Sequence, residues 1–214
     1  MPECHAGYSY GARSVNPELI LFDFGGVISP EGFQLGVLKM SMEFEKSFQK
    51  MYELVGYYAG LKSGYTTGKI SEERYWEIVE ERLNIKESMR HYRSYFLDNF
   101  QPRNDMVALM KNLYENGYKL GIFSDQTNWI YEINEKVDFM QYCKYKFISW
   151  KLGYTKHDDE FFLIPSRESG IPPDKILVID DKPRVIGKVK KVGMEGYLFT
   201  TVNELQDYLK QLLS

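Results

Sequence analysis

The chain has 214 residues, with 27 Lys or Arg and 30 Asp or Glu, and a formal net charge of −3. This length can bury a substantial core, and 43% hydrophobic and 27% charged residues are ordinary for a globular protein. No cluster of Lys and Arg runs along one face, so we expect no nucleic-acid partner. No apolar stretch approaches the ~20 residues of a membrane span, so we expect no membrane partner either.

The amino-terminal segment, residues 1–16, is rich in Gly, Tyr and Ser. It lacks the charged start and apolar core of a signal peptide, and we expect a loose arm. Cys4 and Cys143 lie far apart in the sequence. A disulfide framework is therefore not expected, and the cytoplasm is the default location. Cys4 and His5 offer only two ligands, too few for a metal site.

A run of four apolar residues, 19–22, ends at Asp23 and is followed by Gly25 and Gly26. This pattern predicts a buried parallel strand that enters a tight loop. It places a carboxylate at the carboxyl end of a central strand, where open α/β sheets hold ligands. The glycines let the backbone approach a bound group and offer N–H dipoles to an anion. Many Asp residues end strands only as turn formers, so this motif alone leaves both interpretations open.

Residues 29–100 carry helical patterns and no strand signal. Ser71 is a predicted N-cap, because acids fill the next two positions, where the helix dipole favours them. Trp76, Val79 and Leu83 then make an apolar stripe at helical spacing. Residues 42–58 form another aromatic-rich helical stretch. We expect these stripes to be the core of a helical bundle rather than a substrate-binding surface.

Three further strands end in polar residues, with helical segments between them. They are predicted at residues 118–123, 146–148 and 176–179. The polar residues that follow are, in chain order, Ser124 and Asp125, then Lys156, then Asp180 and Asp181. The carboxyl ends of parallel strands meet at one edge of a sheet, so we expect these side chains to converge with Asp23. Adjacent acids repel each other, which favours a cation or a lysine nearby.

The remaining segments continue the alternation of helix and strand. Asn104 is a predicted N-cap of a helix that Gly117 stops, and residues 158–168 are helical although Pro165 should kink or shorten that helix. A strand at 195–199 precedes a last helix, whose capping box starts at Thr201. This pattern predicts an α/β fold, a doubly wound parallel sheet with right-handed crossovers. Residues 17–28 and 101–214 would form its core and residues 29–100 an inserted helical subdomain.

Taken together, the motifs resemble those of the haloacid dehalogenase (HAD) superfamily over roughly residues 17–200. The matching segments are residues 21–27, 122–125, 153–156 and 178–183. The resemblance implies a Rossmann-like core with a helical cap at residues 29–100. It also implies a Mg²⁺-dependent hydrolase, most simply a small-molecule phosphatase whose partner is a phosphorylated metabolite.

The same resemblance implies a role for each motif residue. Asp23 would attack phosphorus and form an aspartyl-phosphate, with Ser124 and Lys156 as its catalytic partners. The ligands of Mg²⁺ would be Asp23, the backbone carbonyl of Gly25 and Asp181, with Asp180 bound through water or in the outer shell. The phosphoryl oxygens would be held by Ser124, Lys156 and the backbone N–H groups of Phe24, Gly25 and Asp125.

One position departs from the pattern. Phosphatases of this superfamily usually carry a second Asp, two residues after the nucleophile, that protonates the leaving oxygen and then activates water; here that residue is Gly25. Losing a general acid/base typically costs on the order of 10²–10⁴ in rate. The glycine variant resembles a group that includes the amino-terminal phosphatase of soluble epoxide hydrolase and glucose-1-phosphate phosphatase-like proteins, which favours activity. Candidate replacements are Lys62, Glu31, Tyr57, Tyr58 and Tyr65.

Three alternatives remain open. A 2-haloacid dehalogenase also lacks the second Asp, but it needs no metal and usually loses the paired acids at 180 and 181. The second is a weakly active or non-catalytic phosphate-binding or regulatory protein, although a pure binding module has no need to keep the nucleophile. A mutase normally keeps the missing acid. His157 stands where the family often has proline and is expected to be a surface histidine, and Ser149 is expected to cap or turn.

Overall fold

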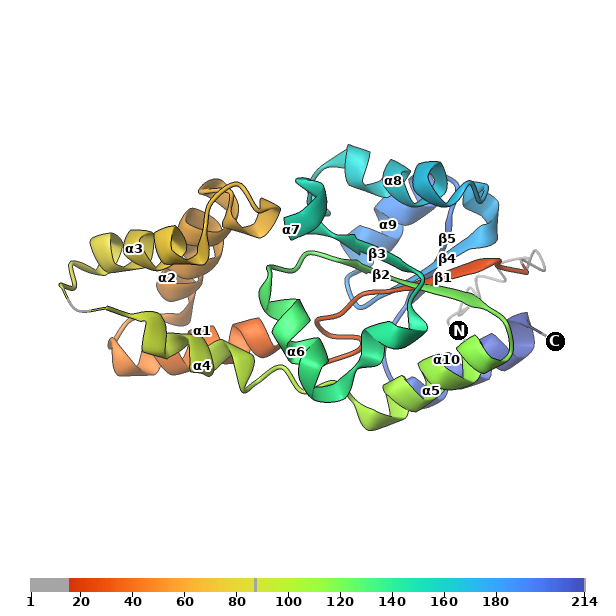
Figure 1. The fold of residues 1–214 in the computed structure, drawn as a ribbon, viewed down its shortest axis with the longest axis horizontal. Coiled ribbons are helices and arrows are strands. Elements are labelled where there is room, and N and C mark those ends of the chain that lie inside the picture. The colour runs from red at the N-terminus through yellow and green to blue at the C-terminus, as the bar shows by residue number, and fades with distance from the viewer. Residues whose placement is uncertain (1–15, 87, 214) are drawn as a thin grey trace, which may run out of the picture.

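The computed structural model describes residues 16–86 and 88–213. Five parallel strands form one sheet in the order β3-β2-β1-β4-β5 (Figure 1). The strands are β1 (Leu19–Phe22), β2 (Lys119–Ser124), β3 (Tyr145–Ile148), β4 (Ile176–Asp180) and β5 (Glu195–Leu198). The predicted doubly wound α/β fold is therefore confirmed, and β1, which carries the first motif, lies at the centre of the sheet.

Helices cover both faces of the sheet (Figure 1). One face is covered by α5 (Asn104–Glu115), α6 (Trp129–Val137) and α10 (Val202–Leu212), and the other by α8 (Asp159–Ser169) and α9 (Pro183–Lys191). Shorter helical turns are η4 (Phe139–Tyr142), α7 (Ser149–Leu152) and η5 (Pro173–Lys175). In β1, Ile20 and Phe22 pack toward the first face and Leu19 and Leu21 toward the second. Because both faces are covered, β1 is apolar at all four positions.

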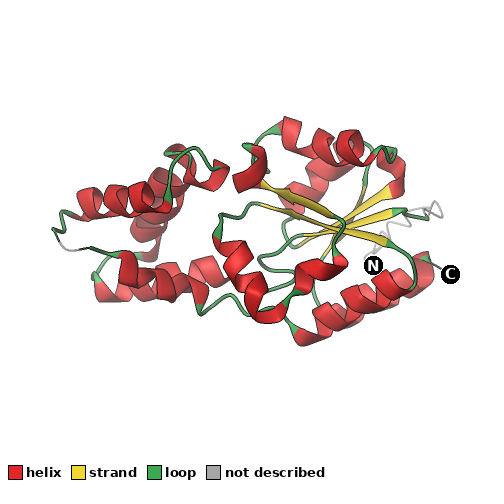
Figure 2. Cartoon of the chain, in the orientation of Figure 1, coloured by secondary structure: helices red, strands yellow, loops and turns green. Residues whose placement is uncertain are grey.

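The helical insert, residues 30–100, lies between β1 and β2, beside the sheet, and its described residues contain no strand (Figure 2). Its elements are α1 (Gly32–Glu43), α2 (Phe48–Tyr52), the π-helix η1 (Glu53–Lys62), the 3₁₀ turn η2 (Tyr65–Thr67), α3 (Glu72–Leu83), the 3₁₀ turn η3 (Arg90–Tyr92) and α4 (Arg93–Leu97). Trp76 and Val79 are buried in a core of the insert itself, and Leu83 packs against it. The aromatic stripe of α3 is thus core, as its spacing predicts.

A polar network fastens the insert to the loop and helix after β2. Arg93 donates to Glu72 at 2.6 Å and also contacts Glu132 of α6. Asn128 joins the two parts, because it donates to Glu72 at 3.3 Å and accepts from the hydroxyl of Tyr65 at 2.7 Å. The Glu72 side chain is only 12% exposed. The sequence pattern gives this acid a role at the helix start, whereas the structure also makes it a partner of two other elements.

Two predicted caps are confirmed, and one is wrong. The side chains of Ser71 and Thr201 accept from the backbone N–H three residues later, each at 3.3 Å. The helix assigned to Asn104 begins there, but its N-cap is Arg103. The guanidinium of Arg103 donates to the carbonyls of Gly26 and Val27, and its own N–H donates to a carbonyl of the same loop. These contacts with the first loop fix where the helix starts.

Two other local expectations need correction. The helical stretch predicted at 42–58 is interrupted, because α1 ends at Glu43 and a new helix starts after Ser47, whose side chain accepts from Lys50. Pro165 does not shorten its helix, since α8 continues to Ser169. Pro165 is buried on the face that packs on the sheet, where its ring contributes apolar surface.

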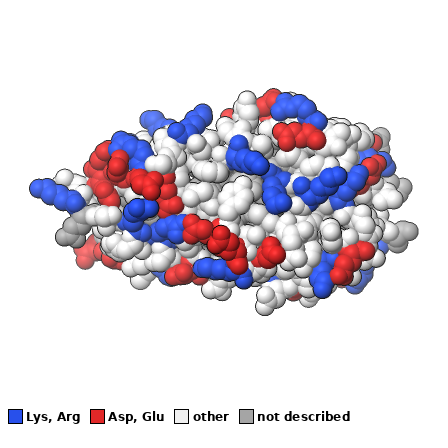
Figure 3. All heavy atoms as spheres, in the orientation of Figure 1, with Lys and Arg blue, Asp and Glu red and all other residues white. Residues whose placement is uncertain are grey.

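The predicted amino-terminal arm lies outside the described residues, apart from residue 16, as do Cys4 and His5. No helix among the described residues combines the length and apolar character needed to cross a membrane. On the face drawn in Figure 3, basic and acidic side chains are interspersed, and no large area carries one sign of charge. This distribution agrees with the lack of a basic cluster in the sequence.

Candidate active site

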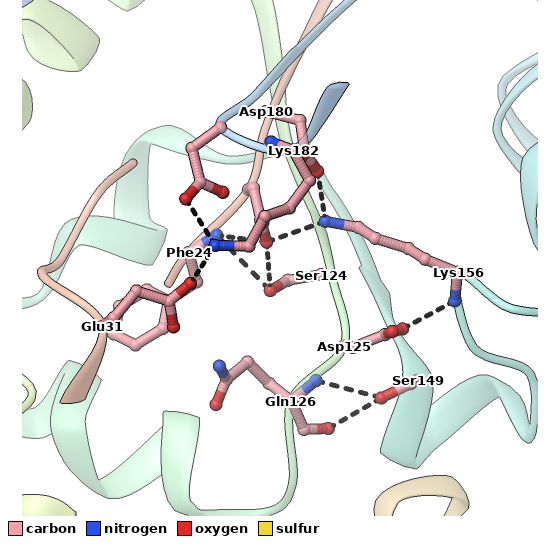
Figure 4. Close-up of polar contacts among 11 residues, drawn as sticks. Phe24, Glu31, Ser124, Asp125, Gln126, Ser149, Lys156, Asp180 and Lys182 are labelled. Carbon is pink, nitrogen blue, oxygen red and sulfur yellow. Dashed lines mark hydrogen bonds and ion pairs between the residues drawn. The ribbon is translucent and has the colours of Figure 1, made fainter. Parts of the chain in front are cut away.

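The strand ends bring Asp23, Ser124 and Lys156 into contact. In Figure 4 the side chains of Ser124 and Lys156 converge on the same point. Oδ1 of Asp23 accepts from the Ser124 hydroxyl at 2.6 Å and lies 2.9 Å from Nζ of Lys156. The backbone N–H of Phe24 donates to the same oxygen at 2.7 Å. Asp23, Ser124 and Lys156 are all buried. A carboxylate at the end of the central strand thus has a hydroxyl, an N–H group and an ammonium directed at it.

Lys156 lies between acids from three strand ends. Its Nζ donates to Oδ2 of Asp180 at 2.7 Å, and its backbone N–H donates to Asp125 at 2.8 Å. Burial lowers the pKa of Lys156, but the charges of Asp23, Asp180 and Asp125 more than offset it, so the pKa lies above its ordinary value. Lys156 is therefore a positive charge in a buried position, unlike a lysine on a solvated loop.

The buried acids hold their protons more tightly than usual. Burial raises the pKa of Asp125 to about 6, although the positive charge of Lys156 opposes the shift. Burial and the charge of Asp23 raise the pKa of Asp180 to about 7, again against Lys156. One lysine therefore does not neutralise all the carboxylates gathered here.

Three of these acids could hold a metal ion. One carboxylate oxygen from each of Asp23, Asp180 and Asp181 lies within 4.8 Å of the others. Oδ1 of Asp181 is buried and has no hydrogen-bond partner among the described residues. Ligands on opposite sides of Mg²⁺ are about 4.2 Å apart, given ~2.1 Å per bond. The donor set is all oxygen and one oxygen is unpaired, so these residues fit a hard divalent cation.

The two glycines of the first loop differ in conformation. Gly26 has a φ of +87°, and a Cβ on it would lie 2.4 Å from Oδ2 of Asp181. Gly25 is not among the described residues with positive φ, and a Cβ there would meet nothing closer than Glu31, at 3.4 Å. The loop is held by the N–H of Gly26, which donates to Ser29. Glycine is required at 26, where the backbone approaches an acid, and not at 25.

Sequence reasoning assigned no role to Lys182, which follows the acid pair. Its Nζ donates to Asp181 at 2.7 Å and to Glu31 at 2.5 Å (Figure 4). Burial lowers the pKa of Lys182, but these two carboxylates raise it further than burial lowers it. The only signal in the sequence is its position next to Asp181. Its link to Glu31, 151 positions away, depends on the fold.

A cavity of about 570 Å³ opens above these residues and reaches under the insert. Its floor includes Asp23, Ser124 and Lys156, and its walls include side chains from α2, η1 and η2. Tyr57 and Tyr65 line it, whereas Lys62 does not. Other lining residues that are charged, or that the sequence analysis singled out, are Gly25, Glu31, Asp125, His157, Lys182 and Arg184. A second hollow, about 630 Å³, lies between α5 and α10, away from the strand ends, and no acid is among its described lining residues.

Of the replacements suggested for the missing acid, two face elsewhere. The charged groups of Lys62 and Arg82 lie over the ring of Tyr58, and neither Tyr58 nor Lys62 lines the cavity. His157 is exposed, as expected, but it lies at the cavity wall. Ser149 has a structural contact, because its hydroxyl both donates to and accepts from the backbone of Gln126. It ties the end of β3 to the loop after β2.

The family model described as haloacid dehalogenase-like hydrolase matches residues 20–198, which contain all four motifs. The chain belongs to this family. The family is named for dehalogenases, but its description covers hydrolases more broadly, so membership establishes a HAD-like hydrolase rather than a substrate.

Two curated relatives are a hydrolase and a phosphatase by name. Flavin mononucleotide hydrolase 1 of Arabidopsis thaliana is 29% identical over 128 residues, 60% of this chain and 49% of the relative. The matching segment therefore spans about half the length of that protein. D-ribitol-5-phosphate phosphatase of Bacteroides thetaiotaomicron is 21% identical over 184 residues, 83% of this chain and 89% of the relative.

Solved structures share the fold. A predicted HAD-like family hydrolase of Porphyromonas gingivalis superposes with a TM-score of 0.76 at 17% identity, covering 92% of this chain and 98% of that one. A HAD family enzyme of Bacteroides thetaiotaomicron, in complex with magnesium and inorganic phosphate, gives 0.69 at 17% identity, over 86% and 94% of the two chains. At this identity the likeness extends to the fold alone.

Proposed function

We propose that this protein is a Mg²⁺-dependent phosphatase that hydrolyses small phosphoric monoesters through an aspartyl-phosphate on Asp23. The observation that carries the proposal is the contact of Asp23 with Ser124 and Lys156 at the floor of a cavity, beside the acid pair at the end of β4. A carboxylate that only ends a strand would need neither a hydroxyl nor a buried lysine in contact with it. The names of the two relatives, a hydrolase and a phosphatase, support the same reaction class.

In the proposed reaction, the carboxylate of Asp23 attacks phosphorus, and the bond to the leaving oxygen breaks. Ser124 and the N–H of Phe24, which contact Asp23 in the free protein, donate to phosphoryl oxygens once substrate is bound. The backbone N–H groups of Gly25 and Asp125 would add to this set. Lys156 neutralises charge on the transferred group and keeps Asp23 ionised.

Asp23, Asp181 and the carbonyl of Gly25 would hold Mg²⁺, with Asp180 supporting them from its contact with Lys156. When bound, the ion would neutralise the charges of the phosphate and of the acids around it. Asp181 offers the unpaired oxygen, and Asp180 has both oxygens engaged, by Lys156 and by the N–H of Lys182. This difference supports Asp181 as the direct ligand.

A small phosphorylated metabolite suits the cavity, whose 570 Å³ is typical of sites for small molecules. Its walls carry many aromatic residues, which are Phe33, Tyr52, Tyr57, Tyr65, Tyr75, Phe100 and Trp129. These walls favour an ester whose alcohol has an apolar or flat part over one that is polar throughout. The sparing use of cysteine supports a cytoplasmic location as part of the proposal.

The test is a turnover screen with and without Mg²⁺. Aryl phosphates, sugar phosphates, D-ribitol 5-phosphate and flavin mononucleotide are the substrates, and EDTA-treated protein is the metal-free arm. Asp23→Asn should abolish turnover without unfolding the protein, whereas Asp207→Asn, the same change at an exposed position of α10, should not alter it. Near-normal turnover by Asp23→Asn would rule out covalent catalysis at this residue.

The same screen separates the alternatives. Release of chloride from 2-chloropropionate without metal would favour a dehalogenase. Binding of inorganic phosphate with no turnover of any ester would favour a non-catalytic protein. The acid pair at 180 and 181, which a metal-independent dehalogenase does not need, supports the phosphatase.

A further inference from the structure

We propose that Glu31 is the catalytic acid/base of this protein and that its carboxylate occupies the place left open by glycine at position 25. The inference rests on the proposed phosphatase reaction and names the residue that gives a proton to the leaving oxygen and takes one from water. Glu31 comes from the start of the insert, eight positions after the nucleophile, and lines the same cavity as Asp23.

The position of the carboxylate carries the inference. The nearest atom to a Cβ built on Gly25 is Oε2 of Glu31, at 3.4 Å; the side-chain amide nitrogen of Gln126 follows at 3.8 Å and the Glu31 carboxyl carbon at 3.9 Å. A side chain at residue 25 would therefore extend into the space that the Glu31 carboxyl group already fills. An acid attached at position 31 reaches the place where an acid attached at position 25 would lie.

The local backbone delivers Glu31 to this place. Glu31 is the N-cap residue of α1, but its side chain makes no capping hydrogen bond, so the carboxyl group turns toward the cavity instead of the helix end. The next residue, Gly32, packs so closely that a Cβ there would lie 2.6 Å from the ring of Phe100. This contact fixes the start of α1 against the end of the insert.

Lys182 holds the other carboxylate oxygen. Its Nζ lies 2.5 Å from Oε1 of Glu31 (Figure 4). The other oxygen, Oε2, is the atom nearest to a Cβ built on Gly25. The Glu31 side chain is 33% exposed, so it can exchange protons with water. Because Lys182 also contacts Asp181, it is a positioning residue between the acid and the proposed metal ligands.

Other proton-bearing groups at the cavity are less well placed. The carboxylate of Asp125 accepts from the backbone of Lys156, and the hydroxyl of Tyr65 donates to Asn128. Burial strongly raises the pKa of Tyr65, which disfavours it as a proton donor. His157 lines the cavity wall, but none of its atoms is among the three nearest to a Cβ at Gly25.

The proton balance closes over two steps. As the bond from Asp23 to phosphorus forms and the ester bond breaks, the Glu31 carboxyl group gives its proton to the leaving alkoxide. Water then attacks the aspartyl-phosphate, and the Glu31 carboxylate takes a proton from that water. The bond between Asp23 and phosphorus breaks, and phosphate leaves. Ester and water are consumed, alcohol and phosphate are formed, and both side chains return to their starting states.

The decisive experiment compares Glu31→Gln with wild type on aryl and alkyl phosphates. An aryl leaving group needs little protonation, so the variant should release a burst of aryl alcohol and then stall with phosphate on Asp23. Acid quenching should trap this phosphoenzyme, and steady-state turnover should fall by about 10²-fold or more. On alkyl phosphates the first step itself should slow. Glu115→Gln, the same change at an exposed position of α5, is the matched control.

The double variant Gly25→Asp with Glu31→Ala tests the location. It should regain at least about tenfold of the turnover that Glu31→Ala alone loses, because alanine vacates the space and the new carboxyl group at position 25 enters it. Glu31→Gln that keeps wild-type turnover on alkyl phosphates, or that folds normally yet gives no burst with aryl phosphates, would overturn the inference. Failure of the proposed function looks different, because wild type itself would then hydrolyse no ester, with or without Mg²⁺.

Discussion

The contrast between the two glycines of the first loop gives a sharp test of the site geometry. Gly26→Ala and Gly25→Ala add the same methyl group at adjacent positions. The first has a φ of +87° and would place its Cβ 2.4 Å from Asp181, and the second would place it 3.4 Å from Glu31. We expect the two variants to differ strongly in stability although their chemistry is identical.

The expected magnitudes follow from backbone strain and from displacement of the acid. A left-handed conformation costs a non-glycine residue roughly 1–2 kcal/mol. The methyl group would also push Asp181 out of its contact with Lys182, and disrupting a partly buried ion pair adds roughly 1 kcal/mol or more. Gly26→Ala should therefore lose about 2–4 kcal/mol of unfolding free energy. Gly25→Ala should stay within about 1 kcal/mol of wild type, since alanine also lowers the entropy of the unfolded chain.

Urea denaturation of EDTA-treated protein, followed by tryptophan fluorescence, measures both changes without a contribution from bound metal. Trp76 and Trp129 are buried in the core of the insert, so their emission reports unfolding there; circular dichroism should give the same midpoint. Equal losses for the two variants would refute the argument, because the loop would then tolerate both side chains or neither. A stable Gly26→Ala would show that Asp181 does not lie against the first loop.

Three further predictions concern buried groups. Lys156→Met should cost about 3–5 kcal/mol in urea denaturation, because it leaves the buried carboxylates of Asp23 and Asp180 unpaired; a loss under ~1 kcal/mol would contradict the burial. Burial raises the folded-state pKa of Asp125 to about 6, from its ordinary value of 3.8, so its ionisation destabilises the folded state as pH rises through that window. Asp125→Asn removes this penalty, and its stability relative to wild type should therefore rise by up to about 3 kcal/mol between about pH 4 and pH 7; a flat difference would refute the shift. Burial raises the pKa of the Cys143 thiol to about 12, so Cys143 should resist thiol reagents near pH 8 in the folded protein and react once the protein is unfolded. A Cys4→Ser variant isolates this thiol, and rapid labelling of the folded variant would contradict the prediction.

The sheet and its polar strand ends were predictable because they depend on local patterns. Each central strand is an apolar run with a polar residue at its end, and parallel strands point those ends the same way. Asp23, Ser124, Lys156 and Asp180 accordingly lie together, as the order of the motifs predicts. Their roles in catalysis and metal binding stay predictions until the protein is assayed.

Other features depend on contacts that no local pattern records. The start of α5 is set by Arg103, whose guanidinium donates to two carbonyls of the first loop. The capping preference of Asn104 does not set it. Glu72 has the sequence position of a first-turn acid, yet Arg93, 21 residues later, determines its orientation. In both cases a long side chain pairs with a group far away in the sequence, and that pairing overrides the local preference.

The same reasoning explains why position 25 could not be interpreted from the sequence alone. A glycine two positions after a nucleophile suggests either a strained backbone or a lost acid, and the residue type alone excludes neither explanation. Gly25 lacks the positive φ of Gly26, so strain does not account for it. The space beside it holds the carboxylate of Glu31, which reaches that point because the start of α1 packs on Phe100. Glycine at 25 is therefore complementary to glutamate at 31, since a larger residue would displace the carboxylate. A change at one position should alter what the other tolerates, and this coupling is the physical basis of the double-variant test.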